Sequence, residues 1–245
     1  MNTAEISTGL GRAMALVLTL ALAGCGGSGG SGSSNRTSTQ TAEFQVRLIN
    51  LTAGQPLSPP VVFIHTSTLR TFTIGTTATV GLEQLAEGGD TSQLVTEALF
   101  SQAVLAHSAD TAAVPPGGNQ TYTLTIPESS RSGAELSLLT MLVNTNDAFA
   151  GVNAVNIASL AVNGSLTVNG IAYDSGTEAN TESAGTMPGA ADNGEGFNSA
   201  RDDLADEVRM HSGVVTSNDG LTGSVLTQEH RWDNPTVRVI ITRLK

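Results

Sequence analysis

The sequence predicts an all-β fold: an antiparallel β-sandwich with one or two short helices and a long acidic loop. Three observations support this prediction. Several runs of strand length alternate apolar and polar residues, turns rich in Gly and Pro separate the runs, and Thr, Ser, Asn and Gly are abundant in the 245-residue chain. Such a composition favours strands and turns over long helices, and several short strands between turn signals are typical of a sandwich.

The first two predicted strands differ in their expected burial. Residues 44–48 alternate apolar and polar side chains, which is the period of a strand with one buried face. After a Pro-containing turn at 55–60, residues 61–65 are almost entirely apolar, and we expect this strand to be buried more fully.

Two short helices are predicted next. Residues 81–87 are followed by two glycines, a common stop signal for a helix. Residues 91–99 can form a second helix, for which Asp90 or Thr91 would be the N-cap.

The remaining strands follow a Pro-Pro-Gly-Gly turn. Residues 120–126 alternate again, and residues 136–143 form a long apolar run that we take as a central strand. Residues 165–173 and the closing run 236–244 are further candidates. The total is therefore six or seven strands.

Residues 174–207 differ from the rest of the chain. They contain nine acidic residues, one base (Arg201) and few large apolar side chains. We expect a long loop here, and long loops in compact domains often carry function.

The charge and cysteine content exclude several classes of protein. Eleven basic residues against 22 acidic ones give a net charge of −11, and the sequence has no basic run. A nucleic-acid partner is therefore not expected, whereas cations or basic partners suit an acidic surface. The single cysteine, Cys25, allows neither a disulfide within the chain nor a cysteine-based zinc site.

Residues 1–24 have the features of a targeting segment. Arg12 precedes an apolar stretch at 13–23 that is too short to span a bilayer. The stretch ends in Leu22-Ala23-Gly24-Cys25, which resembles the lipobox of bacterial lipoproteins. The resemblance implies cleavage before Cys25 and lipidation of that residue. The alternative is an ordinary secretory signal with a chance cysteine.

The predicted domain organisation follows from this leader. Residues 25–41 would be the lipidated cysteine and a Gly/Ser-rich tether, and residues 42–245 would be the folded domain. Lipidated Cys25 would anchor the protein in a membrane of the cell envelope. Gly26 after the cysteine implies the outer membrane in a Gram-negative cell.

Three stretches supply side chains that can bind a hard cation. They are Asn144-Thr145-Asn146-Asp147, the run from Tyr173 to Asn180 with Glu182 beyond it, and Asp192-Asn193-Gly194-Glu195. Ca²⁺ takes six to eight oxygen ligands from carboxylates, carbonyls and water. None of the stretches matches the EF-hand pattern, so the spacing by itself leaves solvated acidic loops as the alternative.

Two of these stretches resemble a known family. Residues 173–178, YDSGTE, look like the W-D-A-G-T-D/E signature of the spondin N-terminal domain. Residues 146–152, NDAFAGV, are similar to the family's S-P-D-W-F-V-G-V segment. The likeness extends over about residues 42–245, and the two acidic motifs are its most specific part.

The resemblance implies a β-sandwich like that of C2 domains with one bound Ca²⁺. The matching positions imply Asp147, Asp174 and Glu178 as metal ligands, completed by nearby backbone carbonyls. The sequence also departs from the family pattern. The disulfides of animal members are absent, Tyr173 replaces a Trp, and Glu178 stands at the position of the motif's final acid.

Together these features predict a lipid-anchored, calcium-binding protein of the cell envelope that acts in adhesion or recognition and is not an enzyme. Its extracellular or periplasmic ligand is unknown. Two alternatives stay open: a metal-assisted hydrolase that uses the same acidic site, and an envelope protein in which calcium only stabilises the fold.

The His and Trp residues give weaker signals. A Ser-His-Asp triad stays open because its members need not be close in sequence, yet no nucleophile motif accompanies the four histidines. His65 lies in an apolar run and is best read as a satisfied side chain. Trp232, the only tryptophan, is either a packing residue or an exposed binding anchor.

Overall fold

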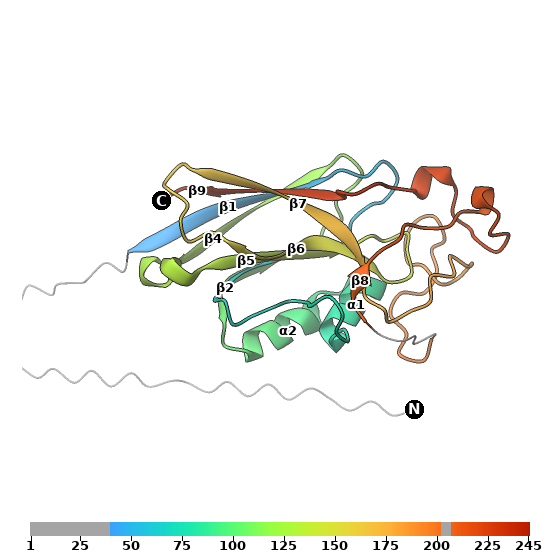
Figure 1. Ribbon diagram of the computed structural model, residues 1–245, viewed down its shortest axis with the longest axis horizontal. Coiled ribbons are helices and arrows are strands. Elements are labelled where there is room, and N and C mark those ends of the chain that lie inside the picture. The colour runs from blue at the N-terminus through green and yellow to red at the C-terminus, as the bar shows by residue number, and fades with distance from the viewer. Residues whose placement is uncertain (1–39, 202–206) are drawn as a thin grey trace, which may run out of the picture. The chain divides into compact units, whose positions relative to one another are not determined.

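The computed structural model describes residues 40–201 and 207–245. Within these ranges nine strands pair in the order β3-β2-β5-β6-β7-β9-β1-β4, with β8 paired to β7, and every pairing is antiparallel. Figure 1 shows that the strands form two layers and that α1 and α2 lie against one of them. The all-β, antiparallel prediction is confirmed, whereas the predicted signal peptide (1–24), Cys25 and most of the tether (25–41) lie outside the described residues.

The elements have the following bounds. The strands are β1 (Thr41–Asn50), β2 (Val61–His65), β3 (Val104–Ala109), β4 (Asn119–Pro127), β5 (Glu135–Met141), β6 (Ala148–Asn156), β7 (Ser165–Asp174), β8 (Arg209–Met210) and β9 (Val237–Arg243). The helices are α1 (Val80–Gly88) and α2 (Ser92–Phe100), and short 3-10 turns occupy η1 (Glu128–Gly133), η2 (Ser217–Asp219) and η3 (Gln228–His230).

The predicted count of six or seven strands is wrong because β3, β6 and β8 were not predicted. Strand β3 is only partly buried and shows no clean alternation. Strand β6 is rich in Ala and Gly, which have low strand propensity. Strand β8 has two residues and owes its conformation to its pairing with β7.

Strand β7 belongs to both layers of the sandwich. Its first six residues pair with β9, and its last four pair with β6. The change of partner falls between Gly170 and Ile171, opposite Gly151 of β6. A Cβ at position 151 would lie 1.9 Å from the carbonyl oxygen of Leu138, so only glycine allows β5 and β6 to approach this closely.

The main core lies between the two layers. Phe44 and Leu48 of β1 meet Leu136 and Leu138 of β5 there, together with Val239 of β9, and all five are fully buried. Burial alternates along β1, because only one of its faces contacts the core. Strands β2 and β5 are buried on both faces, which explains their continuous apolar sequences.

The two helices cover the outer face of the layer that contains β2 and β5 (Figure 1). Leu82 and Leu85 of α1 pack there against Phe63 of β2 and Phe149 of β6. The Thr79 hydroxyl accepts a hydrogen bond from the Leu82 amide at 3.2 Å and caps α1. Both predicted helices are therefore confirmed.

The start of α2 combines the two predicted capping residues. Thr91 occupies the N-cap position, but its side chain makes no capping bond. The Asp90 carboxylate accepts a hydrogen bond from the Ser92 amide at 2.8 Å instead.

Two long segments gather at one end of the sandwich. They are the segment between β7 and β8 and the segment between β8 and β9 (Figure 1). Met187, Val214 and Leu226 from these segments form a small core of their own, against which Trp232 packs. No helix in the described ranges is both long and apolar enough to cross a membrane.

The close approach at Gly151 yields a test of the fold. We expect Gly151→Ala to lower the free energy of unfolding by about 1–3 kcal/mol or to prevent folding, because the added methyl group collides with backbone. Gly133→Ala is the matched control, since a Cβ there meets no atom within 4 Å. Urea unfolding followed by circular dichroism measures the difference, and equal stability of the two variants would contradict the close approach.

Candidate metal centre

Asp147, Asp174 and His211 meet at the end of the sandwich where the long segments gather. Each offers one ligand atom, these atoms lie within 4.8 Å of one another, and all three residues are buried. Strand pairing sets their positions: Asp174 is the last residue of β7 and pairs with Ala148, the residue after Asp147. His211 follows β8, and its amide donates to the carbonyl of Ala172 at 3.1 Å.

The Asp147 carboxylate is the most buried group of the cluster, with none of its surface exposed. Its Oδ2 accepts hydrogen bonds from the Ser175 hydroxyl at 3.1 Å, the Thr177 amide at 3.0 Å and the Glu178 amide at 3.2 Å. Its Oδ1 is buried and has no hydrogen-bond partner among the described residues. Burial, and then the charge of Asp174, raise the pKa of Asp147 to about 7 against the lowering effect of these hydrogen bonds.

Asp174 is held from both sides. Its Oδ1 accepts from the Gly176 amide at 2.8 Å and lies 3.4 Å from the guanidinium of Arg209. Its Oδ2 accepts from the Asn180 side chain at 2.8 Å. Gly176 has a φ of +74°, and a Cβ at this position would lie 2.6 Å from the Glu207 carbonyl oxygen. The turn after Asp174 therefore requires glycine.

Glu178, the third residue that the resemblance implied as a ligand, points its carboxylate elsewhere. That carboxylate forms an ion pair with Arg201 at 2.7 Å and accepts a hydrogen bond from Asn146 at 3.0 Å. The backbone amide of Glu178 donates to Asp147 at 3.2 Å. The structure thus brings Asp147 and Asp174 together and places the Glu178 carboxylate beside Arg201.

His211 was not among the predicted ligands. Its Nδ1 accepts a hydrogen bond from the Gly213 amide at 2.9 Å, so the ring proton sits on Nε2, which donates to Asn180 Oδ1 at 3.2 Å. Burial lowers the pKa of His211 and keeps the ring neutral. In this arrangement His211 orients Asn180, which in turn donates to Asp174. No local sequence signal pointed to it, because only the β7–β8 pairing brings it to the cluster.

The two aspartates of the cluster belong to a larger group of buried acids. The described residues contain five buried carboxylates: Glu87, Asp147, Asp174, Glu178 and Glu182. The Asn146 side chain donates to the Glu178 carboxylate at 3.0 Å and accepts from the backbone amide of Glu182 at 3.1 Å. Burial raises the pKa of Glu182, as it does for Asp147.

The other predicted oxygen donors have structural contacts. Asn144 accepts a hydrogen bond from the Ala191 amide at 3.1 Å and donates to the Gly54 carbonyl at 3.2 Å. Asp192 accepts from the Gly185 and Met187 amides and closes a loop. Asp192 and Glu195 therefore stand outside the three-residue cluster within the part of the chain that is described.

The chemistry of the cluster fits a hard divalent cation. A buried carboxylate oxygen without a partner beside a second carboxylate is costly unless a cation or a proton compensates it. His211 Nε2 donates a hydrogen bond to Asn180, and Nδ1 accepts one from the Gly213 amide. Both ring nitrogens are therefore engaged, and the groups that the cluster offers to an ion are carboxylate oxygens. Oxygen donors suit Ca²⁺ better than zinc or copper.

A buried Ser-His pair also occurs, between the neighbouring strands β2 and β5. His65 Nε2 lies 2.8 Å from the Ser137 hydroxyl, and Nδ1 lies 2.8 Å from the Thr66 carbonyl. Both side chains are fully buried, and burial lowers the pKa of His65. No substrate can reach this hydroxyl in the structure, which agrees with the interpretation of His65 as a satisfied side chain.

The fold and the cluster define an all-β domain with a group of buried acids in its end loops. The family model for Spondin_N matches residues 52–192, which include both acidic motifs. The chain belongs to the Spondin_N family, and the predicted resemblance is confirmed. This family consists of extracellular-type domains. A comparison with curated proteins gives no match.

The buried acid Glu87 on α1 predicts a pH-dependent stability. Burial raises its pKa to about 7, against hydrogen bonds from Thr177 and the Asn198 amide. Below pH ~4.5 the group is protonated in both states, so burial has no cost. Between pH ~4.5 and ~7 the unfolded chain loses the proton first, and the free energy of unfolding falls by up to about 3 kcal/mol.

Glu87→Gln removes this loss. We expect the variant to be more stable than the parent at pH 8 and equal to it at pH 4, as measured by urea unfolding in EDTA. Glu229→Gln, at an exposed position, is the control and leaves the pH profile unchanged. The same difference between Glu87→Gln and the parent at both pH values would contradict the buried-acid account.

The Glu178–Arg201 pair provides a further test. Arg201→Met removes the ion pair between Arg201 and the buried Glu178 carboxylate, and we expect the free energy of unfolding to fall by about 3 kcal/mol. The double change Arg201→Met/Glu178→Gln should recover most of this loss, because the uncompensated charge disappears. Arg47→Met, on the exposed face of β1, is the control. No recovery in the double variant would refute the pairing.

Proposed function

We propose that this protein is a lipid-anchored recognition protein of the bacterial cell envelope whose domain binds one Ca²⁺ ion in its end loops. The observation that carries the proposal is the fully buried Asp147 carboxylate, which lies beside Asp174 and has no hydrogen-bond partner for its Oδ1 in the described chain. In this proposal Asp147 and Asp174 hold the ion. Glu178 would join them only by leaving Arg201.

The ion would act on the loops rather than on a substrate. Asp147 stands before β6, and Asp174 ends β7 and opens the long acidic segment. A cation bound by both would neutralise their mutual repulsion and fix the start of that segment against the sandwich. Loops held in one conformation bind a partner with a smaller loss of entropy, which suits adhesion or recognition.

The proposed location in the cell envelope rests on the predicted signal peptide, residues 1–24, and the residues that follow it. The lipobox at 22–25 and the Gly/Ser-rich tether support lipidation of Cys25, and Gly26 supports the outer membrane. The extracellular type of the family agrees with a location outside the cytoplasm. The proposal contains no catalytic step, and the hydroxyl groups beside Asp147, those of Ser175 and Thr177, are buried.

Thermal unfolding of the full chain in detergent tests the cation. We expect Ca²⁺ to raise the unfolding temperature by several degrees over EDTA, since a ligand at a hundredfold excess over its Kd adds about 2.7 kcal/mol. Asp174→Asn should abolish this shift. Asp90→Asn, which keeps a capping oxygen at the start of α2, is the control and should retain it.

Two results would contradict the proposal. If Ca²⁺ does not raise the unfolding temperature of metal-free protein, the proposed calcium site is refuted. Turnover of an ester, glycoside or phosphodiester that requires Ca²⁺ and is lost in Asp174→Asn would favour the hydrolase alternative. If Asp174→Asn loses the Ca²⁺ shift but still binds its partner as the parent does, the ion has a purely structural role.

A further inference from the structure

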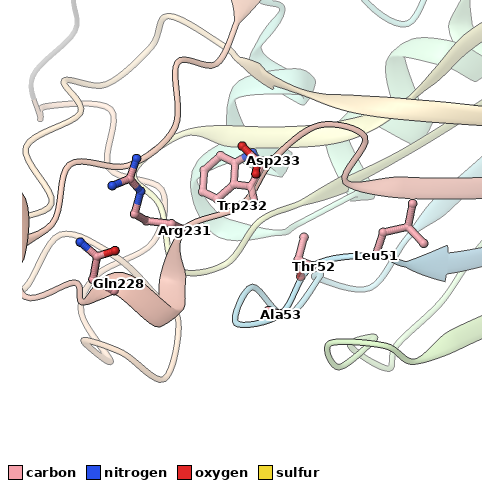
Figure 2. A pocket seen from close by; sticks show the side chains of 7 residues that line it. All are labelled: Leu51, Thr52, Ala53, Gln228, Arg231, Trp232 and Asp233. Carbon is pink, nitrogen blue, oxygen red and sulfur yellow. The ribbon is translucent and has the colours of Figure 1, made fainter.

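A second candidate site lies in a cavity of about 480 Å³ at the same end of the sandwich. Leu51 and Thr52, after β1, line one side, and Gln228, Arg231, Trp232 and Asp233, before β9, line the other. Figure 2 shows Gln228, Arg231, Trp232 and Asp233 on one segment and Leu51, Thr52 and Ala53 on the other. The volume falls within the range of about 300–1,000 Å³ that is usual for small-molecule sites.

The walls of this pocket are fixed before any ligand arrives. The Leu51 amide donates to the Thr236 carbonyl at 2.8 Å, and the Gln55 side chain donates to the His230 carbonyl at 2.8 Å. These bonds tie the two loops together. The Trp232 ring is supported by His211, with the ring centres 5.3 Å apart. A preformed pocket loses little entropy on binding.

The polar groups of the pocket are held in defined positions. The Arg231 guanidinium forms an ion pair with Asp219 at 2.9 Å, and the Gln228 amide donates to the same carboxylate at 3.4 Å. Asp233 is exposed beside Trp232 and offers a carboxylate as acceptor. The lining therefore presents donors and acceptors around one half-buried aromatic ring.

This combination selects a neutral, hydroxyl-rich ligand. A free anion would meet Asp233, Asp219 and a chain with a net charge of −11, and a cation would meet Arg231. A sugar ring is neutral, carries hydroxyl groups that donate and accept at its rim, and has C–H groups on its faces that can lie against an indole.

We propose that the Trp232 pocket binds a pyranose unit of a neutral carbohydrate. Trp232 lies against one face of the sugar, Asp233 accepts hydrogen bonds from its hydroxyls, and Arg231 and Gln228 donate to them. The inference supplies a ligand class for the recognition role proposed above. It does not depend on the cation, because neither Asp147 nor Asp174 lines the pocket.

The chain provides its own probe, since Trp232 is its only tryptophan. The full chain is purified in a detergent without a sugar headgroup. Its tryptophan fluorescence is then titrated with glucose, galactose, mannose, N-acetylglucosamine, lactose, cellobiose, maltose and chitobiose. We expect a saturable change with at least one sugar at a Kd in the millimolar range or below, both in EDTA and in Ca²⁺.

Variants separate a built site from a chance contact. Asp233→Asn should weaken binding of that sugar at least tenfold in the fluorescence titration. Glu229→Gln, an exposed carboxylate on the same turn that does not line the pocket, should leave it unchanged. Trp232→Ala should remove binding, and Trp232→Phe should retain part of it, as measured by saturation-transfer NMR on protein whose fold is checked by circular dichroism.

Three results would overturn the inference: no saturable change with any sugar of the panel, equal binding by the parent, Asp233→Asn and Trp232→Ala, or saturation by a tetralysine peptide and by no sugar. The calcium proposal and the sugar inference can be refuted independently of each other. Sugar binding without a Ca²⁺ shift leaves this inference intact and refutes the calcium site, and a Ca²⁺ shift without sugar binding does the reverse.

Discussion

The arrangement of the end loops depends on one constraint, the complete burial of the Asp147 carboxylate. One of its oxygens accepts three hydrogen bonds from residues 175–178, and these bonds fix the course of the chain after β7. The other oxygen has no partner within the described chain. Because the charge of Asp174 lies beside it, the pair is satisfied only by a proton or by a cation.

The scaffold explains why the carboxylates meet at this place. Strand β7 changes partner from β9 to β6, so its last residues run beside the start of β6 and place Asp174 next to Asp147. A chain of contacts then leads outward: Asn180 donates to Asp174, His211 donates to Asn180, and Trp232 packs on His211. His211 thus links the proposed cation centre to the proposed sugar pocket, because it belongs to the cluster and supports Trp232, which lines the pocket.

Sequence reasoning succeeded where local pattern and burial coincide. Alternation predicted β1 and β4, and continuous apolar runs predicted β2 and β5, which helices or a second layer cover on both faces. Strand β6 was not predicted, because the close approach of Gly151 to Leu138 requires small residues, and such residues are typical of loops. In the site, the resemblance pointed to Asp147 and Asp174, which the structure brings together, and their role as metal ligands stays a prediction. The position of His211 and the turning of Glu178 toward Arg201 arise from contacts between distant segments, which spacing does not encode.

Equilibrium dialysis against radioactive Ca²⁺ tests the central claim most directly, because it counts bound ions without relying on stability. The parent chain and Asp147→Asn are compared at pH 8, above the pKa of about 7 to which burial and the charge of Asp174 raise Asp147. The account predicts one bound Ca²⁺ per parent chain and none per Asp147→Asn chain. No bound calcium in the parent, or equal binding by both, would contradict the assignment of the buried carboxylates to a cation.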